Sequence, residues 1–108
     1  MMALRRRSVL ATAALVLASG AHVAQGGVDE GKAAYEKQCK ACHSIAGEGG
    51  KMAEKGGPLD GVGTKRDAAW LRAYVKDAKS QKADAKMPKL PLGDQQLEDV
   101  VAYLLMLK

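Results

Sequence analysis

Two cysteines and a histidine form a short motif whose spacing points to a definite chemistry. Cys39 and Cys42 are three positions apart, and His43 follows the second cysteine directly. This Cys-x-x-Cys-His pattern is typical of c-type haem attachment, in which two thiols add to the vinyl groups of one haem. The adjacent imidazole then lies where it can bind the iron. The motif therefore predicts one haem c, attached through Cys39 and Cys42, with His43 as an iron ligand.

Other uses of the two thiols are less well supported by the rest of the sequence. A structural zinc site needs four Cys or His ligands, and the only further histidine, His22, lies in a segment that we expect to be removed. A thioredoxin-like redox pair needs a βαβ setting, but no run of β-branched and aromatic residues predicts a parallel sheet. A simple disulfide between Cys39 and Cys42 stays open as an alternative.

The N-terminal segment has the pattern of a secretory signal peptide. Arginines at positions 5–7 precede an apolar stretch from Val9 to about Val23. The double arginine also suggests a twin-arginine signal, but haem is attached after export, so we favour export of the unfolded chain by the general secretory route. An uncleaved membrane anchor is the competing interpretation, because the apolar stretch is close to the minimum length that spans a bilayer.

Small residues in the leader allow cleavage after Ala21 or after Gly26. We expect residues 1–26 to be removed, which leaves residues 27–108 as a single small domain in the periplasm. No membrane attachment is expected after cleavage. The location follows from the leader, and the oxidising compartment agrees with the use of both cysteines for haem.

Removal of the leader also changes the charge of the chain. Three of the 17 basic residues belong to it, whereas all 12 acidic residues remain, so the formal charge falls from +5 to +2. Basic and acidic residues are interleaved along the domain, which is typical of a solvated surface, and no nucleic acid binding is expected. Lys40, Lys86 and Lys89 lie near the predicted haem loops. They would steer an acidic redox partner, unless they are ordinary solubilising lysines.

Apolar periodicity predicts three helices and no strand, which is an all-α fold. The first helix runs from about Asp29 to Cys39, the second begins after Asp67, and the third runs from about Asp94 to the C-terminus. Asp29 and Asp67 are candidate N-caps. The last two helices carry apolar faces, which comprise Trp70, Leu71, Tyr74, Val75 and Ala78, and Leu97, Val100, Val101, Leu104 and Leu105. A Gly-rich loop over residues 47–63 and a Pro-containing loop over residues 87–93 separate the helices.

This order of helix, haem motif, Gly-rich loop, helix, Met-Pro loop and final helix resembles the class I monohaem c-type cytochromes over essentially all of residues 27–108. In that family a glycine and an aromatic residue of the first helix pack against the last helix. Gly31, Tyr35, Val100 and Tyr103 occupy the matching positions. The resemblance implies a small cytochrome c fold, with three main helices wrapped around one covalently bound haem. Tyrosine replaces the usual phenylalanine at Tyr35, so its hydroxyl needs water or a polar partner.

The resemblance implies that Met87 is the sixth ligand of the iron. Met87 lies 44 positions after His43 and just ahead of the last predicted helix. Pro88 restricts Met87 to extended backbone, which would help to hold the thioether against iron. Two rivals are weaker, because Met52 lies in a Gly/Lys-rich stretch and Met106 belongs to the terminal helix.

Four further residues are candidates for haem contact. Gly57-Pro58-Leu59 is similar to the family's Gly-Pro-x-Leu segment, although one residue is missing. The resemblance implies that the Pro58 carbonyl accepts a hydrogen bond from the second nitrogen of His43, and that Leu59 covers one haem face. Arg66 and Trp70 are candidates for contact with a haem propionate. Alternatively, Trp70 is an ordinary core residue and Arg66 an ordinary exposed one.

His/Met ligation would fill both axial positions of the iron, which could then only change valence. The predicted function is therefore an exported single-electron carrier, not an enzyme, that is monomeric and makes transient contacts with a donor and an acceptor redox protein at the exposed haem edge. One alternative is a cytochrome subunit of a periplasmic dehydrogenase or oxidase complex. Another is a haem enzyme or gas sensor with a labile sixth ligand.

Overall fold

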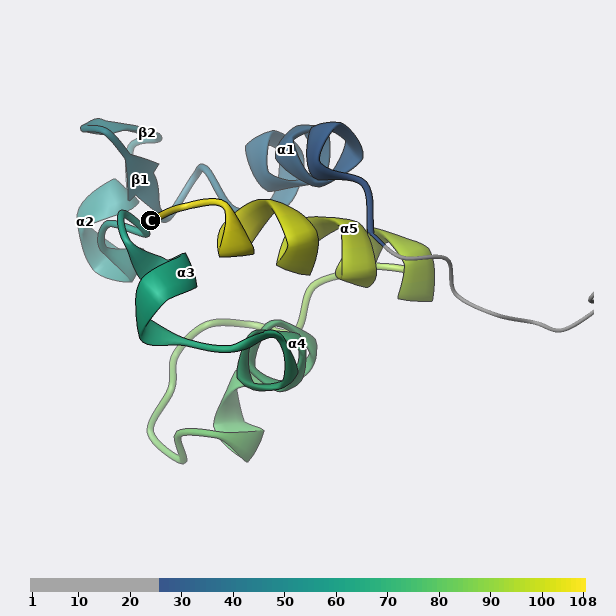
Figure 1. Ribbon diagram of the computed structural model, residues 1–108. Coiled ribbons are helices and arrows are strands. Elements are labelled where there is room, and N and C mark those ends of the chain that lie inside the picture. The colour runs from purple at the N-terminus through teal and green to yellow at the C-terminus, as the bar shows by residue number, and fades with distance from the viewer. Residues whose placement is uncertain (1–25) are drawn as a thin grey trace, which may run out of the picture.

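The computed structural model describes residues 26–108, which form a mostly helical molecule (Figure 1). Apart from Gly26, the predicted leader lies outside the described residues. The helices are α1 (Val28–Gln38), α2 (Ala53–Gly56), α3 (Val62–Lys65), α4 (Ala68–Lys76) and α5 (Asp94–Leu105), with a 3-10 turn at Ala78–Ser80. Two short strands are present, β1 (Ser44–Ile45) and β2 (Glu48–Gly49). Within residues 26–108, no helix is long and apolar enough to cross a membrane.

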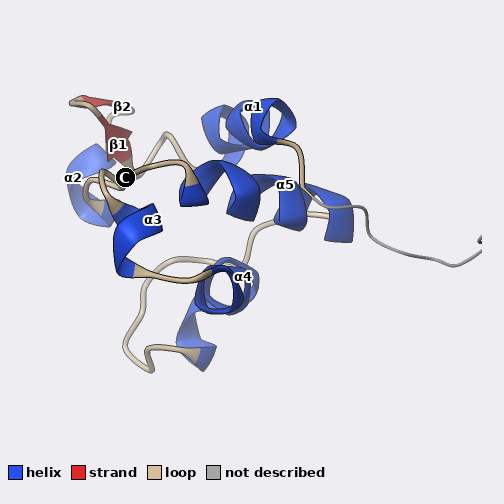
Figure 2. Ribbon diagram, in the orientation of Figure 1, coloured by secondary structure: helices blue, strands red, loops and turns tan. Residues whose placement is uncertain are grey.

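The three predicted helices correspond to α1, α4 and α5, as the ribbon in Figure 2 shows. The N-cap prediction for α4 is confirmed, because the Asp67 carboxylate accepts a hydrogen bond from the Trp70 N–H at 2.8 Å. The N-cap prediction for α1 is wrong. Gly27 is the cap, and Asp29 lies in the first turn, where its negative charge favours the helix dipole. The final helix ends at Leu105, short of the C-terminus.

The predicted absence of strands is also wrong, although the fold remains helical. β1 and β2 pair antiparallel, with Ser44 opposite Gly49 and Ile45 opposite Glu48. The turn between them has positive φ at Ala46 (51°) and Gly47 (81°). Such a pair of residues forms a tight two-residue hairpin, and Gly47 makes this turn accessible at low steric cost. The hairpin, α2 and α3 all lie within the predicted Gly-rich loop, where the segments are too short for a periodic pattern.

Helix α5 is the centre of the core, with α1 packed on one side and α4 on the other (Figure 1). Its face holds the fully buried Val100 and the buried Val101 and Leu104, which pack with Leu71 and Val75 of α4. An arginine of α4 also pairs with a glutamate of α5, Arg72 with Glu98. This arrangement places the turn that follows α1, where the Cys-x-x-Cys-His motif lies, next to one end of the core.

The expected close crossing of α1 and α5 is present at Gly31. A Cβ atom at this position would overlap the Asp99 carbonyl oxygen and would lie 2.8 Å from the Tyr103 Cβ. One turn further on, the rings of Tyr35 and Tyr103 have their centroids 5.7 Å apart at an interplanar angle of 49°. The contact of a glycine and an aromatic residue of α1 with α5 therefore matches the prediction.

Replacement of Gly31 by alanine tests this crossing. We expect Gly31→Ala to lower the free energy of unfolding by about 1–3 kcal/mol, because the added methyl group must displace the α5 backbone. The measurement is equilibrium denaturation in urea, with Glu36→Ala on the exposed face of α1 as a control that should change stability by less than about 0.5 kcal/mol. Helix propensity alone predicts that Gly31→Ala stabilises the protein by about 1 kcal/mol, so a gain in stability would contradict the close approach.

Candidate functional site

The two cysteines and the histidine lie in a single turn directly after α1. The N–H groups of Cys42 and His43 both donate to the Cys39 carbonyl at 3.1 Å. The N–H of Cys39 donates in turn to the Tyr35 carbonyl at 2.8 Å, so the turn is joined to the last turn of α1. Both thiols are free, with Cys39 buried and Cys42 half-buried. The backbone thus presents two unlinked thiols and one imidazole together.

The imidazole of His43 is oriented by a backbone carbonyl. Its Nδ1 lies 3.0 Å from the Gly57 carbonyl oxygen. Because a carbonyl can only accept, Nδ1 carries the proton and donates, which leaves the lone pair on Nε2. A donor contact of this kind fixes the ring and raises the basicity of the other nitrogen, as in metal-ligating histidines. The side chain is therefore prepared to bind a metal through Nε2.

The acceptor differs from the one that we expected. The prediction of the Pro58 carbonyl is wrong, and the acceptor is the carbonyl of the preceding residue, Gly57. Gly57 has φ 78° and ψ 174°, a conformation that is readily open only to glycine, and this turns its carbonyl toward His43. Pro58 itself continues the chain past Ser44 in a parallel bridge. The backbone angles of Gly57 therefore decide which carbonyl accepts the hydrogen bond from His43.

Gly56 is a site residue that the sequence analysis missed. A Cβ atom at Gly56 would overlap the Cys42 carbonyl oxygen and would lie 2.8 Å from Cε1 of His43. The end of α2 therefore packs directly on the haem motif, and this is possible only without a side chain. The pair of glycines before Pro58 was the available signal, because consecutive glycines often mark a close backbone approach.

The environment of Cys39 is apolar. Burial raises the pKa of the Cys39 thiol to about 11. The thiol is therefore protonated at neutral pH, and because the thiolate is the reactive form, the bare side chain is a poor nucleophile and a poor metal ligand. No group of three or more His, Cys, Asp or Glu side chains is placed to hold a metal ion within the described residues. The zinc alternative therefore gains no support from this part of the chain.

Met87 lies in the extended segment between the 3-10 turn and α5. It is half-buried and lines a hollow of about 420 Å³, together with Asp77, Lys79, Ala85, Lys86, Pro88 and Lys89. The two rival methionines are more exposed, with Met52 at 45% and Met106 at 62%. The Met52 N–H donates to the Ala41 carbonyl at 3.0 Å, so Met52 lies at the surface beside the cysteine turn. Met87 therefore has the more enclosed setting that a fixed ligand needs.

Arg66 and Trp70, the candidates for a propionate contact, contact each other. The Arg66 guanidinium carbon lies 4.1 Å from the centre of the Trp70 ring, which is a cation–π contact. Trp70 also stacks on Tyr74, with ring centroids 4.7 Å apart at an interplanar angle of 13°. Trp70 is half-buried against the core, as is Leu59. The propionate contact of Arg66 and Trp70 stays a prediction, as does the covering of a haem face by Leu59.

The three lysines that we singled out have different surroundings. Lys86 and Lys89 are exposed and line the hollow beside Met87. Lys89 forms an exposed ion pair with Asp77 at 3.7 Å, which is worth little in water. Lys40 lies in the cysteine turn, where its carbonyl accepts from the Gly50 N–H at 2.7 Å. Together with Lys79, which lines the same hollow, Lys86 and Lys89 make the surroundings of Met87 basic.

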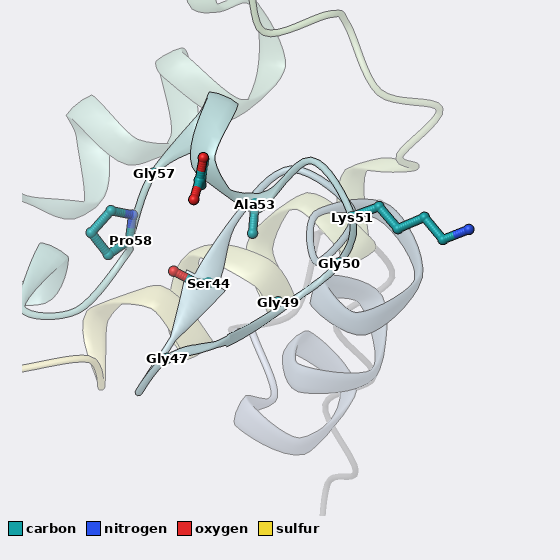
Figure 3. Close-up of a pocket in the computed structure, with 9 residues that line it drawn as sticks. Ser44, Gly47, Gly49, Gly50, Lys51, Ala53, Gly57 and Pro58 are labelled. Carbon is teal, nitrogen blue, oxygen red and sulfur yellow. The ribbon is translucent and has the colours of Figure 1, made fainter.

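A second hollow has Gly57 and Pro58 in its wall (Figure 3). It has a volume of about 550 Å³ and is lined by Ser44, Gly47, Gly49, Gly50, Lys51, Ala53, Glu54, Gly57 and Pro58. Four of these nine residues are glycines, which the close-up labels. No Cys or His lines it.

The hydroxyl of Tyr35 is buried and has no hydrogen-bond partner among the described residues. Burial raises the pKa of Tyr35, and the neighbouring Tyr103, Cys39 and Asp60 raise it further. The sequence predicted water or a polar partner for this hydroxyl, and no side chain or backbone group within residues 26–108 is that partner. A buried donor without a partner costs about 1–3 kcal/mol.

Removal of this hydroxyl should stabilise the fold. We expect Tyr35→Phe to raise the free energy of unfolding by about 1 kcal/mol, since the ring contact with Tyr103 is kept and the unpaired donor is lost. Urea denaturation at neutral pH measures the change. Tyr103→Phe, at a half-buried ring, is the matched control and should be nearly neutral. A loss of stability in Tyr35→Phe would mean that the hydroxyl is hydrogen-bonded in the mature protein.

The described residues fit the chemistry of a covalently bound haem. Two free thiols and an imidazole with an available Nε2 share one turn, which is the donor set that haem c requires. A half-buried thioether, Met87, is present in addition and lines a hollow to which Cys39, Cys42 and His43 do not contribute. The close contact of Gly56 with Cys42 and His43, and the hydrogen bond from His43 to the Gly57 carbonyl, hold the imidazole in place.

Comparisons with known proteins agree with this fit to a covalently bound haem. The family model for cytochrome c matches residues 28–108. A chain in the crystal structure of SoxXA from P. pantotrophus is similar, with 30% sequence identity and a TM-score of 0.64, over 79% of this chain and 84% of that chain. No curated protein matches the sequence significantly. From the motif, the helical fold and the match to the family model, we conclude that this chain belongs to the cytochrome c family, whose members bind haem c and transfer electrons.

Proposed function

We propose that this protein is a monohaem single-electron carrier, with haem c attached through Cys39 and Cys42 and the iron bound by His43 and Met87. The observation that carries the proposal is the bond from His43 Nδ1 to the Gly57 carbonyl, because it leaves Nε2 free beside the two thiols. When bound, the haem supplies reversible one-electron chemistry at its iron. The chain itself binds, orients and shields that group.

The ligands have distinct roles in this proposal. Cys39 and Cys42 tie the group to the turn after α1, and the Gly57 carbonyl holds His43 in one orientation. Met87 supplies a soft, neutral ligand that favours the reduced metal and raises the potential. Pro88 limits the backbone freedom of Met87, which reduces the entropy lost when the thioether is held in place. With both axial positions filled, no position is open for a substrate, so we propose no enzymatic activity.

Electron exchange needs a surface where partners can approach. Lys86 and Lys89 border the hollow that contains Met87, and Lys86 has no ion pair among the described residues. Exposed positive charge accelerates the approach of an acidic partner, and salt weakens this attraction. We therefore propose transient contacts with an acidic donor and an acidic acceptor. The leader sequence supports export to the periplasm. We propose that the mature protein then acts as a monomer without membrane attachment.

A second candidate is a cytochrome subunit of a periplasmic dehydrogenase or oxidase complex. The observation that favours it is the similarity to a chain of SoxXA. The two candidates differ in their behaviour during purification from the native source. A free carrier should elute from gel filtration at the size of the single mature chain, whereas a subunit should elute with other polypeptides at a larger size.

The visible spectrum of the purified, reduced protein before and after addition of carbon monoxide tests the ligation. We expect a low-spin haem c spectrum that carbon monoxide does not change, because both axial positions are filled. The colour should stay with the polypeptide under denaturing conditions, because the attachment is covalent. A prompt spectral change with carbon monoxide would indicate an open or labile sixth position, and the haem enzyme or gas sensor would replace the electron carrier as the best interpretation.

A further inference from the structure

A buried carboxylate holds the chain immediately before α1. Asp99 of α5 is only 8% exposed, and its Oδ1 accepts from the Gly27 N–H at 2.9 Å. The Gln95 side-chain amide donates to the same oxygen at 3.0 Å. No Lys, Arg or His pairs with Asp99 among the described residues. A buried carboxylate that meets only neutral donors lacks the positive partner that buried charges ordinarily have, so this position favours a cation.

The groups around the Gly27 nitrogen are mostly acidic. The Glu30 carboxylate lies directly against Gly27, and Asp29 is in the same first turn of α1. Glu98 is adjacent on α5, but its charge is already paired with Arg72. The N-terminus of α1 contributes a partial positive charge of roughly one half. This is less than the combined charge of Asp29, Glu30 and Asp99, so a further positive charge at Gly27 would be stabilised.

The same nitrogen lies at a predicted processing site. Ala24 and Gly26 are the small residues at the minus-three and minus-one positions of the bond between Gly26 and Gly27. Hydrolysis of this bond adds the hydroxyl of water to the Gly26 carbonyl carbon and its proton to the Gly27 nitrogen. The neutral amide then becomes an α-amino group, which is ordinarily charged at neutral pH because its pKa is about 7.7–8.0. Cleavage after Ala21 would instead leave the Gly27 nitrogen as an amide.

We propose that cleavage between Gly26 and Gly27 creates an ammonium group that forms a partly buried ion pair with Asp99, so that removal of the leader strengthens the contact between the start of α1 and α5. The path of the chain supports this. Gly26 runs so close to α5 that a Cβ atom would overlap the Glu98 carbonyl oxygen, which directs the next nitrogen toward Asp99. One turn later, Gly31 makes the close crossing described above. The proposal rests on the export part of the proposed function and is independent of the haem ligands.

The first experiment is an intact-mass measurement of the exported, haem-containing protein, which should correspond to a chain that begins at Gly27. The second compares this protein with one from a leader cleaved one residue earlier, so that Gly26 is kept, each with Asp99 or with Asp99→Asn. We expect Asp99→Asn to lower the urea midpoint clearly in the chain that begins at Gly27, and much less in the chain that keeps Gly26. Asp84→Asn, which removes an exposed acidic charge far from Gly27 in the sequence, is the matched control and should have a similar effect in both chains.

The pH dependence of the unmodified mature protein gives an independent test that needs no variant. Asp99, Glu30 and Asp29 should all raise the pKa of the Gly27 ammonium above its ordinary value, whereas the N-terminal dipole of α1 opposes this. The stabilisation should thus be complete below about pH 8 and be lost as the pH rises through the higher folded pKa. The chain that keeps Gly26 should lose less stability over that range.

A mature chain that begins at another residue would overturn the proposal, as would an equal effect of Asp99→Asn in both chains. Neither result would bear on electron transfer, because the response to carbon monoxide reports on that function separately. Conversely, a reaction of the haem with carbon monoxide would leave the ion pair intact as a proposal. The two failures are therefore distinguishable.

Discussion

Replacement of His43 by alanine is expected to prevent the accumulation of stable haem-containing protein. His43 is the only histidine among residues 26–108, and its Nε2 is the nitrogen that the Gly57 carbonyl leaves available. Removal of a group that merely orients a metal ligand costs roughly 10–100-fold in affinity. Removal of the ligand itself should cost at least as much. Haem absorbance per polypeptide, measured on equal amounts of exported protein, gives the loss directly.

Pro58→Ala is the matched control for this experiment. Because the acceptor is the Gly57 carbonyl, the side chain of Pro58 is not needed for the bond to His43. We expect Pro58→Ala to keep normal haem content and a normal spectrum. If His43→Ala accumulated haem-containing protein with an unchanged low-spin spectrum, the assignment of His43 as a ligand would be wrong.

Replacement of Met87 by alanine should have the second large effect, and of a different kind. The haem should stay covalently attached, because both thiols and His43 are unchanged. The sixth position should open, so carbon monoxide should bind to the reduced protein, and the reduction potential should fall. Axial ligands set haem potentials over a range of about 0.8 V, so the fall should be easily measured by redox titration.

Met52→Ala is the control, because Met52 is the exposed methionine beside the cysteine turn. It should leave the spectrum and the potential unchanged. If Met87→Ala failed to open the sixth position, and Met52→Ala opened it, Met52 would be the ligand. The pair of variants thus decides between the two thioethers.

Local patterns explain why much of the fold was predictable. The apolar faces of α4 and α5 follow from the helical repeat alone, and the Asp67 cap depends on a contact only three residues away. The Cys39, Cys42 and His43 motif is likewise contained in five consecutive residues, so its chemistry is visible before folding. The N-cap of α1 was misassigned to Asp29 because acidic residues are favourable both at the cap and in the first turn. Helix ends are therefore less certain than helix faces.

The rest depended on backbone angles and on contacts between distant residues. The carbonyl that orients His43 belongs to Gly57, and not to Pro58, because φ and ψ of a single glycine decide where the carbonyl points. Arg66 and Trp70 pair with each other because α4 begins just between them. By itself, the sequence determined the cofactor motif and the main helices, since both are local properties. Only the tertiary structure decided the partner of the histidine, the lone hydroxyl of Tyr35 and the bond between Gly27 and Asp99, since each depends on how segments far apart in the chain come together.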